Sequence, residues 1–122
     1  MDGVIPPTRL VDSRPGESAP DPYSTPWPPG TQRPVTVANL LGIPASISSV
    51  VLNVGVVRPT ASGWLTLFPS GTPPNASDVN FGPGLTIANL ALTKVNSDGT
   101  IQIYNAPGGT ADVIADATGY FS

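Results

Sequence analysis

Proline and glycine recur along the whole chain and set the first limit on its fold. The 122 residues include 16 prolines and 13 glycines. Each proline removes a helical hydrogen bond, and each glycine lowers helix propensity. No window places apolar residues at the i, i+3, i+4 and i+7 positions over three turns, whereas apolar and polar residues alternate repeatedly. The sequence therefore predicts an all-β chain with essentially no helix.

Alternating or β-branched segments, separated by turn residues, predict eight or nine short strands. Residues 49–57 are the most β-branched segment and are expected to form a central strand. In residues 100–105, Ile101 and Ile103 share one face. The other expected strands are residues 8–13, 33–39, 63–68, 78–81, 85–93 and 112–121.

Two connections are expected to close hairpins. Residues 58–63 join the strand at 49–57 to the strand at 63–68, and Asp98-Gly99 supplies the positive-φ geometry of a second tight turn. Several strands carry apolar residues on one face and Thr, Ser, Asn or Gln on the other, which is typical of a sheet with one wet side. We expect an antiparallel, jelly-roll-like β-sandwich that forms one domain over residues 1–122.

A proline-rich segment, residues 15–30, interrupts the strand pattern. It cannot join a central sheet, because proline lacks the backbone donor that a ladder needs. Tyr23 and Trp27 are apolar anchors within it. We therefore expect an ordered loop that wraps the sandwich; a floppy insertion is the alternative.

Composition excludes several classes of function. The chain has no cysteine and no histidine, which removes disulfides, thiolate metal sites and the usual general base. Five basic residues against eight acidic ones give a net charge of −3, the wrong sign for a nucleic-acid binder. No apolar stretch approaches the ~20 residues of a membrane helix. We expect no enzyme activity, no nucleic-acid partner and no membrane span.

Asp116 lies between apolar residues in the last expected strand, which predicts a half-buried carboxylate. Such a group needs a partner, and Arg9 and Arg14 are the natural candidates. We expect Arg9 to tie the first strand to the last through Asp116 or Asp12. Asp112 and Asp116 are four residues apart, or about 13 Å along a strand. That separation is too long for a glycosidase carboxylate pair, which needs about 5–9.5 Å.

Calcium is the main metal to consider, because only oxygen ligands are available. Asn96, Asp98 and the carbonyl of Gly99 could form part of a cage. The same residues are fully explained as a turn, so we expect no cofactor and no metal, with calcium as the open alternative.

Four aromatic residues are candidates for an interface or a ligand site: Trp27, Tyr23, Trp64 and Tyr104. Sugar-binding sandwiches stack aromatic faces on pyranose rings. Trp64 alternates with Leu65, so one of the two faces outward, and we favour a Trp64 in the core or covered by the proline-rich loop. Trp27 is the better interface residue, because neighbouring prolines reduce the entropy lost on binding. The alternative is that Trp27 only anchors its loop.

Seven segments cover most of the chain in a recognisable order. They are residues 7–14 (PTRLVDSR), 50–54 (VVLNV), 59–71 (PTASGWLTLFPSG), 77–81 (SDVNF), 86–90 (TIANL), 103–105 (IYN) and 111–121 (ADVIADATGYF). Together they resemble a β-sandwich module of secreted and cell-wall-associated actinobacterial proteins. The resemblance implies an accessory or adhesive unit, not a catalyst, and extends to virions of phages that infect these bacteria. Residues 15–30 are longer and richer in proline than in that family, so no function held there transfers.

We expect a non-enzymatic structural protein at an extracellular surface: a decoration or head-fibre-type component of an actinobacterial phage virion or a similar assembly. Such a protein is expected to form a homo-oligomer, for which a trimer is one candidate symmetry. The alternative is a carbohydrate- or cell-wall-binding accessory module of a secreted actinobacterial protein, with a polysaccharide as its partner. The low charged fraction of 11% suits either setting. A start at Met1 favours a free-standing gene product over a trimmed domain.

Overall fold

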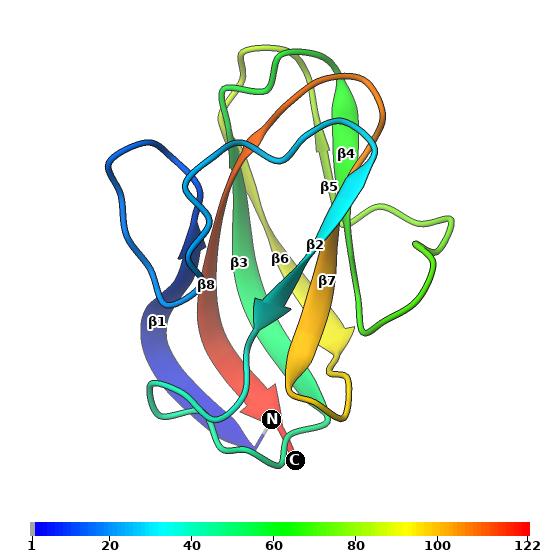
Figure 1. Ribbon diagram of the computed structural model, residues 1–122. Coiled ribbons are helices and arrows are strands. Elements are labelled where there is room, and N and C mark those ends of the chain that lie inside the picture. Colours follow the sequence, from blue (N-terminus) through cyan, green and yellow to red (C-terminus); the bar gives the residue numbers. More distant parts are fainter. Residues whose placement is uncertain (1) are drawn as a thin grey trace.

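The computed structural model describes residues 2–122, which form eight strands in two antiparallel four-stranded sheets (Figure 1). One sheet has the order β1-β8-β3-β6 and the other the order β2-β7-β4-β5, which is the strand order of a jelly roll. The strands are β1 (Gly3–Asp12), β2 (Thr31–Thr36), β3 (Ser49–Val57), β4 (Gly63–Phe68), β5 (Val79–Phe81), β6 (Ile87–Lys94), β7 (Thr100–Asn105) and β8 (Asp112–Phe121). Among residues 2–122 there is no helix long and apolar enough to cross a membrane.

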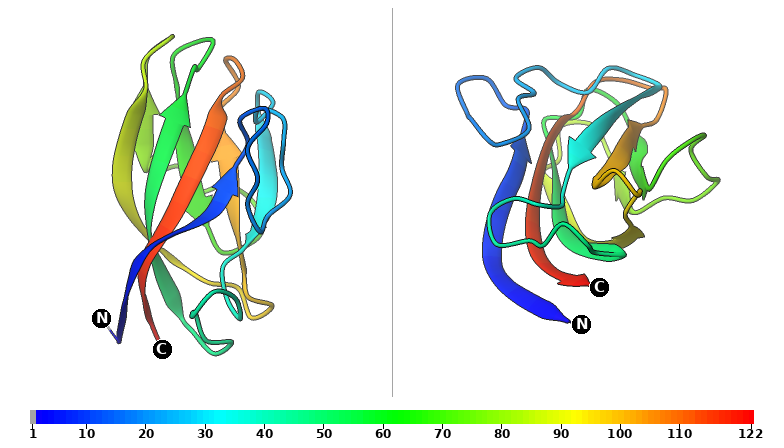
Figure 2. Two further views of the ribbon diagram at one scale, coloured as in Figure 1. Left: turned by 90° about the vertical axis from the view of Figure 1, so that its left-hand side faces the viewer. Right: turned by 60° about the horizontal axis from the view of Figure 1, so that its bottom comes forward.

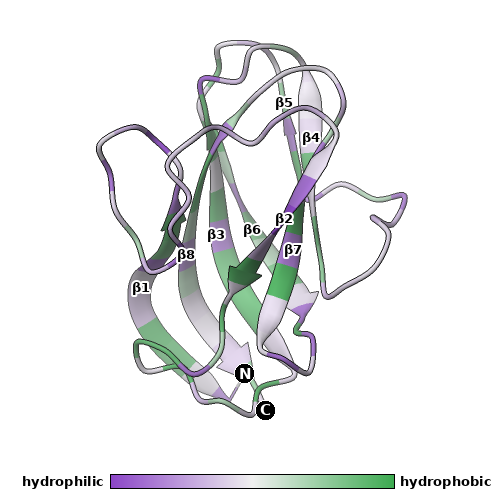
Figure 3. Ribbon diagram, viewed as in Figure 1, coloured by the Kyte–Doolittle hydropathy of each residue, from purple (hydrophilic) through white to green (hydrophobic). Residues whose placement is uncertain are grey.

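The core lies between the two sheets, which Figure 2 shows stacked face to face. In β3, Leu52 and Val54 are fully buried, whereas Asn53 between them points outward. Ile101 and Ile103 of β7 meet them from the other sheet as fully buried side chains. Each such side chain contributes roughly 1.5–3 kcal/mol on burial. Hydrophobic residues are concentrated along the strands, and the connecting loops are mostly neutral or hydrophilic (Figure 3).

Four strands have the bounds that alternation predicts, namely β3, β4, β7 and β8. β1 is longer than expected, because it begins at Gly3 and includes Pro6 and Pro7. These prolines are tolerated because β1 is an edge strand, paired with β8 alone. β2 begins and ends earlier than residues 33–39, and β5 and β6 differ from their expected bounds by one or two residues.

Both hairpin predictions are wrong. β3 and β4 lie in different sheets, as do β6 and β7, so neither connection joins paired strands. The turn before β7 does form: Gly99 has a φ of 83°, and its N–H donates to the carbonyl of Asn96 at 2.9 Å. Turn chemistry fixes the local reversal but leaves open which sheet the next strand joins, and here the chain crosses the sandwich.

The proline-rich segment is held against the sandwich by backbone hydrogen bonds. The Trp27 N–H donates to Ala111 O at 2.8 Å, and the Asp21 N–H donates to Leu10 O at 3.0 Å. The Tyr23 hydroxyl donates to Pro34 O at 2.7 Å. The segment thus joins β1 to β2 and is hydrogen-bonded to both of these strands and to Ala111, the residue before β8.

Candidate functional site

Trp27 and Tyr23 belong to a structural cluster formed by the proline-rich loop and Arg33 of β2. Trp27 is fully buried, and its Nε1–H donates to Ile103 O at 2.9 Å. Its ring centroid lies 5.1 Å from that of Tyr23, and the Arg33 guanidinium lies 4.7 Å from the Trp27 ring and 4.9 Å from the Tyr23 ring. Because Trp27 is buried, its side chain is not available at the surface as an interface or ligand-binding residue. The structure favours the alternative, in which Trp27 anchors its loop.

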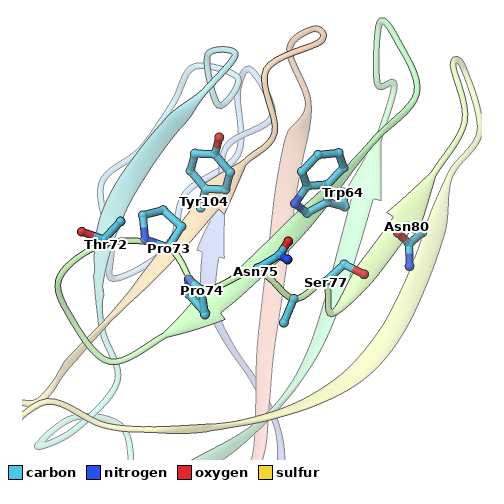
Figure 4. A pocket seen from close by; sticks show the side chains of 9 residues that line it. Trp64, Thr72, Pro73, Pro74, Asn75, Ser77, Asn80 and Tyr104 are labelled. Atoms are coloured by element: carbon cyan, nitrogen blue, oxygen red, sulfur yellow. The ribbon is translucent and has the colours of Figure 1, made fainter.

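Trp64 stands on the outer face of the second sheet, so the prediction that it is buried or covered is wrong. Its side chain is 40% exposed. Tyr104 of β7 pairs with Thr66 of β4, and Trp64 lies two residues before Thr66 on the same face. The two aromatic residues are therefore diagonal neighbours on adjacent strands. Figure 4 shows both rings standing on this face.

The loop between β4 and β5 folds back over the rest of that outer face. The Thr66 hydroxyl donates to Ala76 O at 2.5 Å, and the Leu67 N–H donates to the Asp78 carboxylate at 2.8 Å. Thr66 and Phe68 are therefore buried, although they share a face with Trp64. The loop leaves the Trp64 end of β4 open and forms one wall beside it.

Between this wall and the two rings lies a cleft of about 600 Å³, which we call the aromatic cleft (Figure 4). Asn80 of β5, the cross-strand partner of Trp64, lines it from the other side. Among residues 2–122, none that lines the cleft is charged. Its lining residues are Trp64, Tyr104, Asn80 and the loop residues Thr72, Pro73, Pro74, Asn75, Ala76 and Ser77. The polar residues of the cleft could not be predicted from the sequence, because no periodicity shows that a loop returns over its own strand.

A second surface lies on the opposite sheet, where β6 forms the edge (Figure 2, left). Leu90 and Leu92 point outward from β6 and are 64% and 60% exposed. They pair with Asn53 and Val51 of β3, and these four residues form what we call the leucine face. Alternation could not identify it, because β6 carries apolar residues on both of its faces. The signal that could have found it is the pair Leu90 and Leu92, two large apolar residues on the face opposite the buried Ala91.

A groove of about 380 Å³ lies next to the leucine face. Its floor contains the small residues Gly55 and Ala88, which are cross-strand partners, and Ile114 of β8 lies beside Gly55. Arg9 and Asp116 also line the groove. Protruding leucines and an apolar depression therefore occupy the same side of one sheet.

The arginine and aspartate candidates form a network between β1 and β8. Arg9 Nε donates to Asp116 Oδ1 at 2.8 Å, and Arg9 Nη1 lies 3.1 Å from Asp12 Oδ2. Arg14 Nη2 lies 2.7 Å from the same Asp12 oxygen. Hydrogen bonds from Arg14, the largest influence, hold the pKa of the Asp12 carboxyl below its ordinary 3.8. The network therefore joins the first strand of the chain to the last.

The turn considered for calcium is held by its own hydrogen bonds. Asp98 Oδ1 accepts from the Thr100 N–H at 3.0 Å and from the Thr100 hydroxyl at 2.6 Å. Residues 2–122 contain no group of three or more acidic side chains placed to hold a metal ion. Asp98 thus has a structural role in this turn.

No protein-family model and no curated protein matches this chain. Among residues 2–122, the aromatic cleft and the leucine face are the two surfaces that we take as candidate interaction sites.

Proposed function

We propose that this chain is a non-enzymatic structural protein that self-associates through its leucine face and serves as a surface component of a larger assembly. The carrying observation is the pair of leucines, each about three-fifths exposed, on the edge strand β6. Natural edge strands are usually protected by charges or proline, and contiguous exposed apolar surface marks an interaction site. β6 contains no proline and a single charge, Lys94 at its end.

The partner that fits this face best is a second copy of the chain. A two-fold axis through the face would place the leucines of each copy over the Gly55–Ala88 groove of the other, so that one surface serves both sides. Four leucines at this exposure contribute roughly 4–8 kcal/mol. Association itself costs about 4–15 kcal/mol, so burial of the leucines offsets only the lower part of that range. A stable pair must therefore bury Val51 and Ile114 as well.

We place this assembly on an extracellular surface, as a decoration or head-fibre-type component of an actinobacterial phage virion or a similar particle. The resemblance carried by residues 59–71 and 111–121, together with the charged fraction of 11%, supports this setting. Jelly rolls build viral capsid domains as well as lectins, which is an analogy at the level of the fold.

Light scattering after size-exclusion chromatography tests the proposal. The wild-type chain should show a mass that rises with concentration to a multiple of the 12.4 kDa monomer, and Leu90→Asp should remain at 12.4 kDa. The matched control is Leu41→Asp, because Leu41 is 57% exposed in the loop between β2 and β3. A wild-type chain that stays monomeric up to roughly 100 μM, where micromolar contacts are populated, would contradict the proposal.

A further inference from the structure

We infer that the aromatic cleft is a binding site for a neutral glycan. A pyranose ring would stack on the rings of Trp64 and Tyr104, and the side chains of Asn75, Ser77 and Asn80 would hydrogen-bond its hydroxyl groups. The cleft lies on the β2-β7-β4-β5 sheet and the leucine face on the other sheet, so this inference does not depend on self-association.

The aromatic residues supply the platform. Trp64 keeps 40% of its surface in water, although a nearby loop already covers Thr66 and Phe68 on the same face. Covering Trp64 as well would remove more apolar surface from water than covering Thr66 does. Two ring-bearing side chains on adjacent strands have backbones fixed by the sheet, so little order is lost when a flat ligand binds.

The polar residues supply recognition. Among the side-chain hydrogen bonds formed within residues 2–122, none involves Asn75, Ser77 or Asn80, whereas Thr66 and Asp78 beside them are used to hold the loop. The loop is therefore held in place by the side chains of Thr66 and Asp78. The side-chain amides of Asn75 and Asn80 and the hydroxyl of Ser77 remain available to hydrogen-bond a ligand. A side-chain amide both donates and accepts hydrogen bonds, and so does a sugar hydroxyl, so the two groups are complementary.

Charge and size narrow the ligand class. No charged residue lines the cleft within residues 2–122, and the chain carries a net charge of −3, so phosphorylated and acidic ligands find no counter-ion there. A volume of about 600 Å³ falls in the range of about 300–1,000 Å³ that small-molecule sites occupy. An uncharged, hydroxyl-rich ligand with one flat apolar face fits these limits.

Isothermal titration calorimetry of the full chain tests the inference with four probes: the hexasaccharides of β-1,4-glucose, β-1,4-N-acetylglucosamine, β-1,4-mannose and α-1,4-glucose. At least one should bind saturably. Trp64→Leu and Tyr104→Leu keep apolar bulk but remove the flat ring, so each should weaken binding at least tenfold. Asn80→Ala, which removes only an amide, should weaken binding several-fold. Leu90→Asp, on the opposite sheet, should bind like the wild type.

Thermal unfolding of each variant shows whether a loss of binding reflects a loss of fold. Three results would overturn the inference: no saturable heat with any of the four probes, wild-type affinity in Trp64→Leu, or tighter binding of a hyaluronan hexasaccharide, which is acidic. Each of these outcomes leaves the light-scattering result for the leucine face unaffected, so the two proposals fail separately.

Discussion

At the scale of single residues, the buried carboxylates of Asp12 and Asp21 have pKa values shifted in opposite directions. Asp12 accepts hydrogen bonds from Arg14 and Arg9, which hold its pKa below 3.8. Asp21 has one oxygen bonded to the Thr36 N–H at 2.9 Å, while its Oδ2 has no partner among residues 2–122. Burial raises the pKa of Asp21 from 3.8 to about 6, because a charge there is poorly solvated.

Replacing Asp21 by Asn should therefore stabilise the protein at neutral pH. The native state holds the proton of Asp21 more tightly than the unfolded chain does, so stability falls as the pH rises from about 4 to about 6 and stays lower above that. Asn keeps an acceptor for Thr36 and carries no charge. Urea unfolding should show Asp21→Asn more stable by about 1–3 kcal/mol at pH 7, and close to the wild type below pH 4.

Asp98→Asn is the matched control, with the opposite sign. Hydrogen bonds from Thr100 lower the pKa of Asp98, so its stabilisation is present at neutral pH and is lost as the pH falls below 3.8. Asp98→Asn should be less stable than the wild type at pH 7. If Asp21→Asn were destabilised equally at pH 4 and pH 7, the ionised Asp21 carboxylate would not be destabilising the native state.

At the scale of the elements, β1 depends on one neighbour and one ion-pair network. Arg9 and Asp116 are direct cross-strand partners between β1 and β8. Arg9→Ala should lower the free energy of unfolding by about 1 kcal/mol and the Tm by about 3–6 °C, a modest effect because the Arg9 side chain is partly exposed. Lys94→Ala, which removes a positive charge from β6, serves as the control in calorimetry. Equal Tm values for both variants would mean that the Arg9 contacts add no stability.

Alternation predicts an element well when one face of the strand is buried and the other is wet. That is why β3 and β7 have their predicted bounds. Pairing depends on contacts far apart in the sequence. The turns at residues 58–63 and 96–99 therefore predict hairpins locally, although each connection crosses between the sheets.

The candidate site was less predictable than the strands. Alternation shows that Trp64 and Leu65 face opposite ways but does not show which one faces the core. Trp27, surrounded by prolines, has the local sequence of an exposed loop, yet its ring fills the core and its indole N–H meets a β7 carbonyl. Which loop covers which face is a property of the complete fold.

At the scale of the whole molecule, the two surfaces lie on opposite sheets of the sandwich. A pair formed through the leucine face would leave both aromatic clefts directed away from the interface. Two weak glycan sites on one rigid particle then bind a polymeric glycan more tightly than either does alone. This arrangement suits a surface component that would assemble through the leucine face and bind glycan through the aromatic cleft.

Single-cysteine cross-linking locates the self-association surface most directly, because the chain has no cysteine of its own. Asn53→Cys places a thiol in the leucine face, and Gln102→Cys places one on β7 of the opposite sheet. With a short bis-maleimide, Asn53→Cys should give covalent dimers at micromolar protein concentration, and Gln102→Cys should remain monomeric. Dimers from Gln102→Cys alone, or equal yields from both variants, would contradict assembly through the leucine face.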